Sequence, residues 1–384
     1  MHKSFLAPLL FASALSFASC SLAQSGEPGP VELSDDLPFA AESFGGFDAP
    51  WAIAFEPGTG RIFITEKPGT IKFVDPATGA VGNVGGAPEV ANRGQGGLGD
   101  IAFAPDYADS GMVYLTWAQP MDGGARAAMG RGHLVCHSDT HCQIEDFTQL
   151  WNQSAVGERT GHYSHKIAFS PDGQYLFLSS GERQEGDPAQ DLMDNRGAVL
   201  RLNLDGTPAE GNPFAEMGSP ADQIWSYGQR NLLGFEFDPN GQLWDLEHGP
   251  RGGDELNRVD RGANYGWPAR SNGVNYDGSD IPDHTDDDGF AHAAIWWTPV
   301  IAPSDMIFYT GDMFADWQGQ LLVSTLSTTA IVHIAADADS NTATELGRYT
   351  FPNRLRSIAQ APDGAIWVAE DGANGRLLRL TPAD

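Results

Sequence analysis

Basic residues, cysteines and long apolar runs are all scarce in this sequence. Lysine and arginine together number 22 against 51 aspartates and glutamates, which gives a formal net charge of −29 at pH 7. This balance excludes nucleic acid as the default partner and disfavours docking on anionic lipid, because both require a basic face. The one extended apolar stretch, over residues 5–17, is shorter than the ~20 residues that a membrane span needs. We therefore expect no membrane span.

That apolar stretch has the features of a secretory signal. A basic start precedes it, and small residues follow up to Ala23, as they do before a cleavage site. We expect residues 1–23 to be a signal peptide and the mature protein to be periplasmic or secreted. Cys20 leaves open a lipoprotein, in which that cysteine would carry the lipid.

Only three cysteines are present, and apart from Cys20 they are Cys136 and Cys142. In an exported protein we expect these two to form a disulfide. The loop between them is short, so the bond would contribute about 2 kcal/mol and stabilise a local turn. His137 and His141 lie inside the loop and leave a zinc site as an alternative, although ligands this close together rarely surround one ion tetrahedrally.

Glycine and proline are abundant, with 46 and 25 copies, and a short phrase recurs among them. It consists of a small or apolar residue, usually a phenylalanine next, any residue, a proline, a turn residue and then an apolar-aromatic strand. The turn prolines are Pro57, Pro105, Pro171, Pro239 and Pro362, and a looser copy surrounds Gly319. Each of these six units predicts a hairpin, which cannot bury both of its faces alone.

Radial repetition of such hairpins buries both faces of each. We therefore expect an all-β fold, a six-bladed β-propeller of four-stranded antiparallel blades. Roughly 60 residues per unit exceed the ~40–45 of compact propeller repeats, so long insertions should lie on one rim and carry the function. We expect a polar leader over residues 24–44 and a single propeller domain over residues 45–384.

Glycine, proline and residues with oxygen-bearing side chains are most concentrated in EHGPRGGDELNRVDRGANYGWP, residues 247–268. Gly249 and Pro250, with the glycines after them, allow main-chain carbonyls to point in directions that a regular strand forbids. Such carbonyls, with oxygens from Glu255 and Tyr265, suit a hard cation such as calcium. From these residues alone, an ordinary glycine-rich turn with solvated charges explains the run equally well.

The run is similar to a loop of the soluble quinoprotein sugar dehydrogenases, the glucose/sorbosone dehydrogenase family, which carries pyrroloquinoline quinone (PQQ) and calcium. In that family a Gly-Pro pair offers carbonyls to the calcium under the cofactor, and a following Asp-Glu-x-Asn run helps to bind a second calcium. The matching residues here are Gly249–Pro250 and 254–257, and Asn-Tyr-Gly-Trp-Pro at 264–268 closes the segment. The resemblance covers about residues 45 to 381.

The resemblance also implies catalytic residues. His162 falls on the catalytic base of the family, and Glu182 stands where the family has an aspartate that orients this base. Arg230 matches an arginine over the quinone carbonyl, where it would stabilise developing negative charge.

The cofactor-binding residues follow in the same way. Gln95 matches a glutamine that faces the sugar near the quinone, and Asn231 accompanies Arg230 over the quinone ring. Arg354 and Arg356 match two arginines that hold carboxylates of PQQ, for which guanidinium groups are well suited.

The sequence departs from the family in two further places. Ser164-His165-Lys166 stands where Gly-Gly-Arg is usual, and Ser327 stands where a lysine contacts the cofactor. The missing charge predicts weak PQQ binding, unless Lys166 or another cation reaches in from a neighbouring loop.

The resemblance implies PQQ- and calcium-dependent oxidation of aldose sugars at the anomeric hydroxyl, with a lactone as product and an external electron acceptor. We expect a monomer or a homodimer. Two alternatives remain. One is a calcium-dependent propeller lactonase, which would turn over lactones without a quinone. The other is a cofactor-free binding module, for which Ser327 and Lys166 are the reasons.

Overall fold

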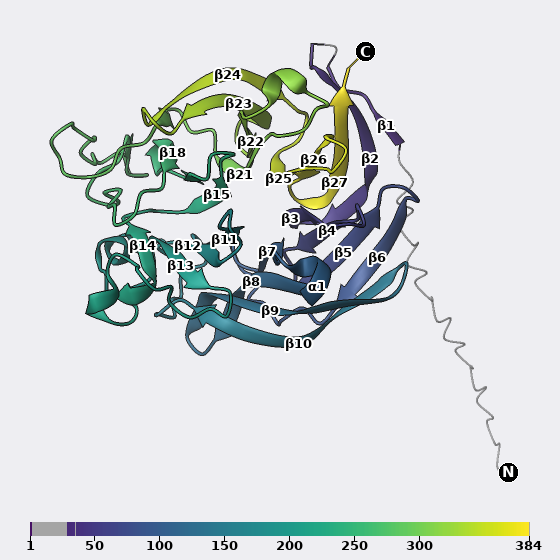
Figure 1. The fold of residues 1–384 in the computed structure, drawn as a ribbon, viewed down its shortest axis with the longest axis horizontal. Coiled ribbons are helices and arrows are strands. Elements are labelled where there is room, and N and C mark those ends of the chain that lie inside the picture. The colour runs from purple at the N-terminus through teal and green to yellow at the C-terminus, as the bar shows by residue number, and fades with distance from the viewer. Residues whose placement is uncertain (2–28, 35, 384) are drawn as a thin grey trace.

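The structure, a computed structural model, describes Met1 and residues 29–34 and 36–383. The expected cleavage region and Cys20 lie outside these residues. Over the part described, antiparallel sheets are arranged radially around a central axis and form six blades (Figure 1). The predicted six-bladed β-propeller is therefore confirmed. No helix in the described part is long and apolar enough to cross a membrane.

Each of the first three blades has four strands, and in each blade the strand that comes first in the sequence lies nearest the axis. The first contains β3 (Pro50–Phe55), β4 (Ile62–Glu66), β5 (Thr70–Asp75) and β6 (Ala80–Gly85). The second contains β7 (Leu98–Phe103), β8 (Met112–Met121), β9 (Gly124–Ser138) and β10 (His141–Asn152), with the short helix α1 (Tyr107–Ser110) after β7. The third contains β11 (Ser164–Phe169), β12 (Tyr175–Ser180), β13 (Ala198–Asn203) and β14 (Ile224–Tyr227).

The next two blades repeat this arrangement. The fourth contains β15 (Leu232–Phe237), β16 (Leu243–Glu247), β18 (Asp254–Arg258) and β20 (Ile295–Trp297). A small ribbon of β17 (Arg251–Gly252) and β19 (Gly273–Val274) is inserted into it. The fifth contains β21 (Pro303–Phe308), β22 (Leu321–Thr325), β23 (Ala330–Asp337) and β24 (Thr342–Thr350). Short 3₁₀ turns lie in the connections at Asp187–Gln190, Ala215–Met217, Ala221–Gln223 and Ala315–Trp317.

The sixth blade joins the two ends of the described chain. Its inner strands are β25 (Leu355–Gln360), β26 (Ile366–Glu370) and β27 (Ala373–Pro382), and its outer strands are β2 (Phe39–Asp48) and β1 (Gly29–Val31). Figure 1 shows purple β2 beside yellow β27, with which it pairs antiparallel. The domain boundary expected at residue 45 thus falls inside β2, and part of the expected polar leader belongs to the propeller.

The six recurring phrases are the first hairpins of the six blades. Each turn proline lies in the connection between the innermost strand and the second strand, and Gly319 precedes β22 in the same place. The second strands β4, β16, β22 and β26 are buried at every position. This explains their nearly continuous apolar sequences, because each blade packs against a neighbour on both faces.

The expected disulfide is present. Cys136 and Cys142 lie opposite each other on β9 and β10 and are bonded. Their hairpin end also pairs with β6 and so links the first two blades. Because both sulfurs are in the bond, they are not available for zinc. In the described part of the chain, the one group of three His, Cys, Asp or Glu side chains whose ligand atoms all lie within 4.8 Å of one another is found elsewhere.

Candidate functional site

One rim of the propeller collects most of the residues singled out in the sequence. The first strand of each blade begins at this rim, and the second strand, antiparallel to it, ends there. Loop residues before β3, β7, β11, β15, β21 and β25, and after β4, β16, β22 and β26, therefore converge. This topology brings together positions as distant in sequence as Lys67 and Arg356.

Two adjacent hollows open at this rim. The first, of about 380 Å³, is called the arginine hollow, and its lining includes Trp51, Lys67, Gln95, Asn231, Arg354, Arg356 and Asp371. The second, of about 520 Å³, is called the histidine hollow, and its lining includes His162, Glu182, Arg230, Pro250, Trp267 and Tyr276. In three short segments, at 162–164, 230–231 and 248–250, one residue lines the histidine hollow and a near neighbour in the sequence lines the arginine hollow. The two hollows therefore share a wall.

The arginine hollow has a surplus of positive charge. Arg354 and Arg356 both pair with Asp371, at 3.2 Å and 2.8 Å. Lys67 donates a hydrogen bond to the carbonyl oxygen of Gly94, and within the described chain it forms no ion pair. Burial, and then the charge of Arg356, lower the pKa of Lys67. Three cations thus face one carboxylate, which favours an anionic ligand.

Neutral groups complete this hollow. The guanidinium of Arg356 lies 4.8 Å from the ring centre of Trp51, which holds both groups in place. His248 contacts the carbonyl oxygen of Pro303 through Nε2, and burial lowers the pKa of its ring to about 3. His248 is therefore uncharged at neutral pH, and Gln95 and Asn231 add amide groups to the lining.

The structure brings His162 and Glu182 into direct contact in the histidine hollow. His162 Nδ1 hydrogen-bonds to Oε1 of Glu182, and both side chains are buried. The other carboxylate oxygen accepts the main-chain N–H groups of Glu185 and Gly186, at 2.5 Å and 2.7 Å. A carboxylate held in this way accepts a hydrogen bond from Nδ1–H, so the proton of the neutral imidazole stays on Nδ1 and Nε2 carries the free lone pair.

Opposing effects set the ionisation of this pair. Burial lowers the pKa of His162, Arg230 lowers it further, and the contact with Glu182 compensates only in part. Burial alone would raise the pKa of Glu182, but the hydrogen bonds and charge of its neighbours outweigh it and lower that pKa. At neutral pH the pair therefore consists of a neutral imidazole and a carboxylate, as a general base requires.

The backbone around His162 explains one departure from the family. His162, Ser164 and His165 have φ values of 49°, 58° and 60°, a left-handed conformation that favours glycine. The usual Gly-Gly therefore fits this turn, and here Ser164 and His165 adopt it instead. His165 is fully buried, stacks on Tyr163 and meets Trp51 edge-on, so it fills space beside the arginine hollow.

Arg230 lies in the wall between the hollows. It donates to the carbonyl oxygen of His248 at 3.0 Å and to the hydroxyl of Tyr276 at 3.3 Å. Its guanidinium lies 5.1 Å from the ring centre of Trp267. Its Nε is buried and has no hydrogen-bond partner in the described structure.

A cluster of buried acids lies behind this wall. Asp245 and Glu247 on β16 are paired in register with Asn257 and Glu255 on β18, so all four side chains lie on one face of the sheet. Nδ2 of Asn257 donates to Asp245 at 3.4 Å and to Glu247 at 3.2 Å. Glu247 also accepts the main-chain N–H of Arg230 at 2.6 Å. The acid cluster therefore contacts the site directly.

No cationic side chain forms an ion pair with the acid cluster within the described chain, although the charge of Arg230 lowers the pKa of Glu247 in part. Burial raises the pKa of Glu247 to about 7 and that of Glu255 to about 8, and it raises the pKa of Asp245 well above its usual range. Oδ2 of Asp245 and Oδ1 of Asn257 are buried without a hydrogen-bond partner. Three buried carboxylates with spare oxygens form an environment that fits a hard divalent cation.

The other residues expected to bind metal have different surroundings. The turn at Gly249 is so tight that a Cβ there would lie 2.2 Å from the carbonyl oxygens of Gly252 and Gly253. Asp254 points to the opposite side of β18 from Glu255, where it binds main-chain N–H groups of residues 249, 301 and 302. The hydroxyl of Tyr265 is used by Arg258 and Asp260, so only its main-chain carbonyl remains for a metal.

Lys166 does not reach the arginine hollow. Its ammonium group lies in the central channel, 3.0 Å from Asp305 and 3.4 Å from Asp100. Ser327 is exposed and bonds to the carbonyl oxygen of Val300. The alternative in which Lys166 replaces the missing lysine is therefore wrong, and the extra cation in the hollow is Lys67.

Sequence reasoning missed Lys67, Asp245 and Glu247. Lys67 stands in Glu-Lys-Pro-Gly, which reads as an ordinary hairpin turn. The two acids could have been found from the sequence. Residues two apart on a strand lie on the same face, and both Asp245 with Glu247 and Glu255 with Asn257 have this spacing. The strand register that places the pairs opposite each other is visible only in the structure.

Known proteins were compared with this chain. The family described as Glucose / Sorbosone dehydrogenase matches residues 47–379. Aldose sugar dehydrogenase YliI from Escherichia coli (strain K12) is 33% identical over 390 aligned positions, which span 100% of both chains. Quinoprotein glucose dehydrogenase B from Acinetobacter calcoaceticus is 25% identical, over 97% of this chain and 94% of its own.

Solved structures agree with these matches. The apo-form of the soluble aldose sugar dehydrogenase from Escherichia coli superimposes with a TM-score of 0.82 at 34% identity, covering 90% of this chain and 100% of its own. The PQQ-bound form of an aldose sugar dehydrogenase from Streptomyces coelicolor gives a TM-score of 0.71 at 26% identity, over 94% and 99% of the two chains. The chain therefore belongs to the Glucose / Sorbosone dehydrogenase family of sugar-oxidising enzymes.

Proposed function

We propose that this protein oxidises aldose sugars at the anomeric hydroxyl to lactones, with PQQ in the arginine hollow, calcium beside it and an external electron acceptor. The observation that carries the proposal is the shared wall between two hollows. One holds a histidine fixed by a carboxylate, and the other holds a surplus of positive charge. A base next to an anion site is what a sugar dehydrogenase with an anionic cofactor requires.

The residues of the arginine hollow fit a tricarboxylate such as PQQ. Arg354 and Arg356 would bind carboxylates as guanidinium forks, and Lys67 would bind as a point charge. Lys67 thus supplies a positive charge that Ser327 cannot. A buried anionic ligand needs such compensation to offset its desolvation. We therefore expect PQQ binding despite the absent family lysine.

The acid cluster and the glycine turn fit calcium. Glu255, Asp245 and Glu247 offer carboxylate oxygens, and Gly249, Pro250 and Tyr265 would add main-chain carbonyls. When both are bound, PQQ supplies an electrophilic quinone that accepts hydride, and calcium polarises it as a Lewis acid.

The protein's own residues would act on the sugar in the histidine hollow. Nε2 of His162 would accept the proton of the anomeric hydroxyl while Glu182 keeps the ring in the correct tautomer. The guanidinium group of Arg230, which lines this hollow, would bind an oxygen that becomes negative during the reaction. Trp267 and Tyr276 would help to exclude water and to orient the sugar ring.

We also infer that the protein acts outside the cytoplasm, in the periplasm or after secretion. The expected signal peptide over residues 1–23 and the bond between Cys136 and Cys142 support this location, because disulfides persist in oxidising compartments.

Reconstitution tests the proposal. Purified protein is saturated with PQQ and calcium, and dye reduction is measured with several aldoses. Hydrolysis of a lactone is measured separately, with and without PQQ. Sugar-dependent dye reduction that requires both PQQ and calcium is the expected result. Lactone hydrolysis without PQQ would instead favour the propeller lactonase, and absence of PQQ binding would favour the binding module.

A further inference from the structure

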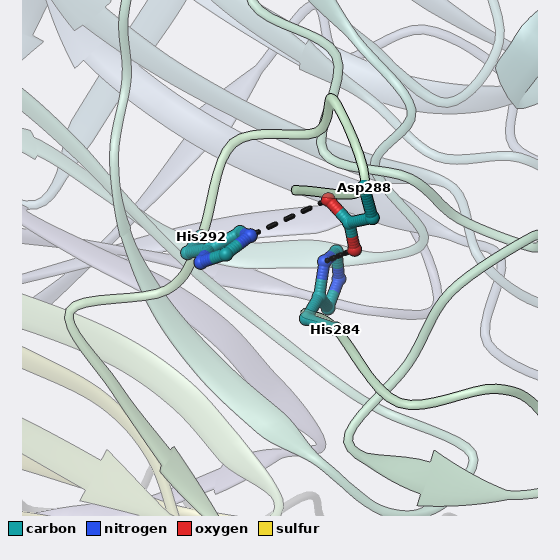
Figure 2. A group of neighbouring side chains, drawn as sticks. All are labelled: His284, Asp288 and His292. Atoms are coloured by element: carbon teal, nitrogen blue, oxygen red, sulfur yellow. Dashed lines mark hydrogen bonds and ion pairs between the residues drawn. The ribbon is translucent and has the colours of Figure 1, made fainter. Parts of the chain in front are cut away.

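The long connection between β19 and β20 contains a second group of metal-ligating side chains. Residues 284–292 read His-Thr-Asp-Asp-Asp-Gly-Phe-Ala-His and form no helix or strand. His284, Asp288 and His292 are four residues apart, and the fold of the loop, not a helical repeat, brings them together. Figure 2 shows Asp288 between the two imidazole rings.

The three side chains have the spacing of ligands to one ion. Nδ1 of His284 lies 3.1 Å from Oδ2 of Asp288, and Nε2 of His292 lies 3.4 Å from Oδ1. All the ligand atoms lie within 4.8 Å of one another. Bonds of about 2.0–2.1 Å at tetrahedral angles place neighbouring ligand atoms roughly 3.4 Å apart. An ion could therefore enter with little movement of the side chains.

The surroundings hold the central carboxylate in place. The side chain of Asp288 is 1% exposed. Its oxygens accept the main-chain N–H groups of Thr285 and Phe290, at 3.1 Å and 3.0 Å. Nε of Arg270 lies 3.5 Å from Oδ2. Outer partners of this kind orient a ligating carboxylate and tune the metal site.

We propose that His284, Asp288 and His292 bind a divalent transition metal of the zinc class, with water completing the coordination. Two imidazoles and one carboxylate suit zinc and its neighbours in the periodic table, whereas calcium takes oxygen ligands alone. The site is thus chemically distinct from the acid cluster of β16 and β18. It requires neither PQQ nor catalysis and is independent of the proposed function.

The position of the site gives the metal a structural consequence. Tyr276, Ile281 and Pro282, on the same connection, line the histidine hollow. His284 also packs against Gly266, where an added Cβ would lie 3.0 Å from its ring. A metal at His284 and His292 would therefore fasten the loop that forms one side of the hollow.

Zinc titration of the full-length protein tests the proposal. Transition metals are removed, calcium is kept in excess to fill oxygen sites, and zinc is added against a chromogenic chelator. We expect one site per chain in the wild type. The His292→Ala variant should bind zinc at least ~10–100-fold more weakly, because substitution of a residue that only hydrogen-bonds to a ligand already lowers metal affinity by this factor. The side chain of His292 is 36% exposed, so this variant should fold normally.

A matched control uses the other histidine pair of the surface. His141→Ala removes a ring from the pair beside the disulfide, where His137 and His141 lie 6.0 Å apart, and it should leave zinc affinity unchanged. The cobalt spectrum of the wild type should indicate nitrogen ligands and change in His292→Ala. Equal zinc affinity in wild type and His292→Ala, loss of zinc only in His141→Ala, or no zinc binding by the wild type would each overturn the proposal.

Discussion

Calcium should matter most to the stability of this protein at high pH, because the acid cluster is uncharged at low pH. Burial raises the pKa of Glu255 from 4.5 to about 8 and that of Glu247 to about 7. Between about pH 4.5 and pH 8 the folded state thus binds more protons than the unfolded chain. The free energy of unfolding of the calcium-free protein must therefore fall as the pH rises through this range.

The size of the effect follows from the same groups. One pKa unit corresponds to about 1.4 kcal/mol, so Glu255 alone should cost the calcium-free fold on the order of 4 kcal/mol at pH 8. Calcium would remove most of this cost by compensating the buried charge, and its stabilisation by mass action grows with concentration. We expect the rise in melting temperature on adding calcium to be clearly larger at pH 8 than at pH 5.

Two isosteric variants make the assay specific. In Glu255→Gln, the calcium-free protein should become more stable at pH 8, while the gain on adding calcium should shrink. Glu236→Gln is the control, because burial also raises the pKa of Glu236 to about 8, but in the central channel away from the cluster. It should raise stability at pH 8 and leave the calcium response unchanged. A calcium gain that is equal at both pH values, or unaltered in Glu255→Gln, would refute the reasoning.

Three further predictions concern the two hollows. His162→Gln should reduce dye-linked sugar oxidation ~10²–10⁴-fold with PQQ binding retained, whereas His165→Ala should mainly lower the melting temperature because that ring is fully buried; an inactive His165→Ala of normal stability would contradict the assignment. Ionised Glu182 favours protonated His162, so Glu182→Gln should shift the acid limb of the kcat/KM pH profile to lower pH, and a shift to higher pH would exclude this role. Lys67→Gln should weaken PQQ binding roughly 10–100-fold in a fluorescence titration, as expected for one charge-assisted contact, and unchanged affinity would show that Lys67 does not compensate for Ser327.

The fold was predictable because its signal is local and repeated. Pro57, Pro105 and the later turn prolines each mark the first hairpin of a blade, so six phrases sufficed to predict six blades. The outer strand β2 was missed because a single polar–apolar segment carries no sign of its partner. Its partner β27 lies more than 300 residues away in the sequence.

The candidate site was predictable only in part. His162 and Glu182 were found through family resemblance, and the structure brings them into contact. The cation that compensates the charge of the ligand was harder to predict from the sequence, because it depends on which loops converge at the rim. Lys166 and Lys67 are both plausible in sequence, and the topology places the first on acids in the channel and the second in the arginine hollow.

The sixth blade, in which β2 pairs with β27, lies next to the first blade, and together they close the ring. A ligand bound between these two blades would help to hold the propeller together. Lys67 belongs to the first blade, whereas Arg354 and Arg356 belong to the last, and all three line one hollow. An anion held between them would bridge the beginning and the end of the chain across the junction of the two blades. Its binding energy would then oppose the separation of these blades, so the ring would open less readily and strands β2 and β27 would be better protected from proteases.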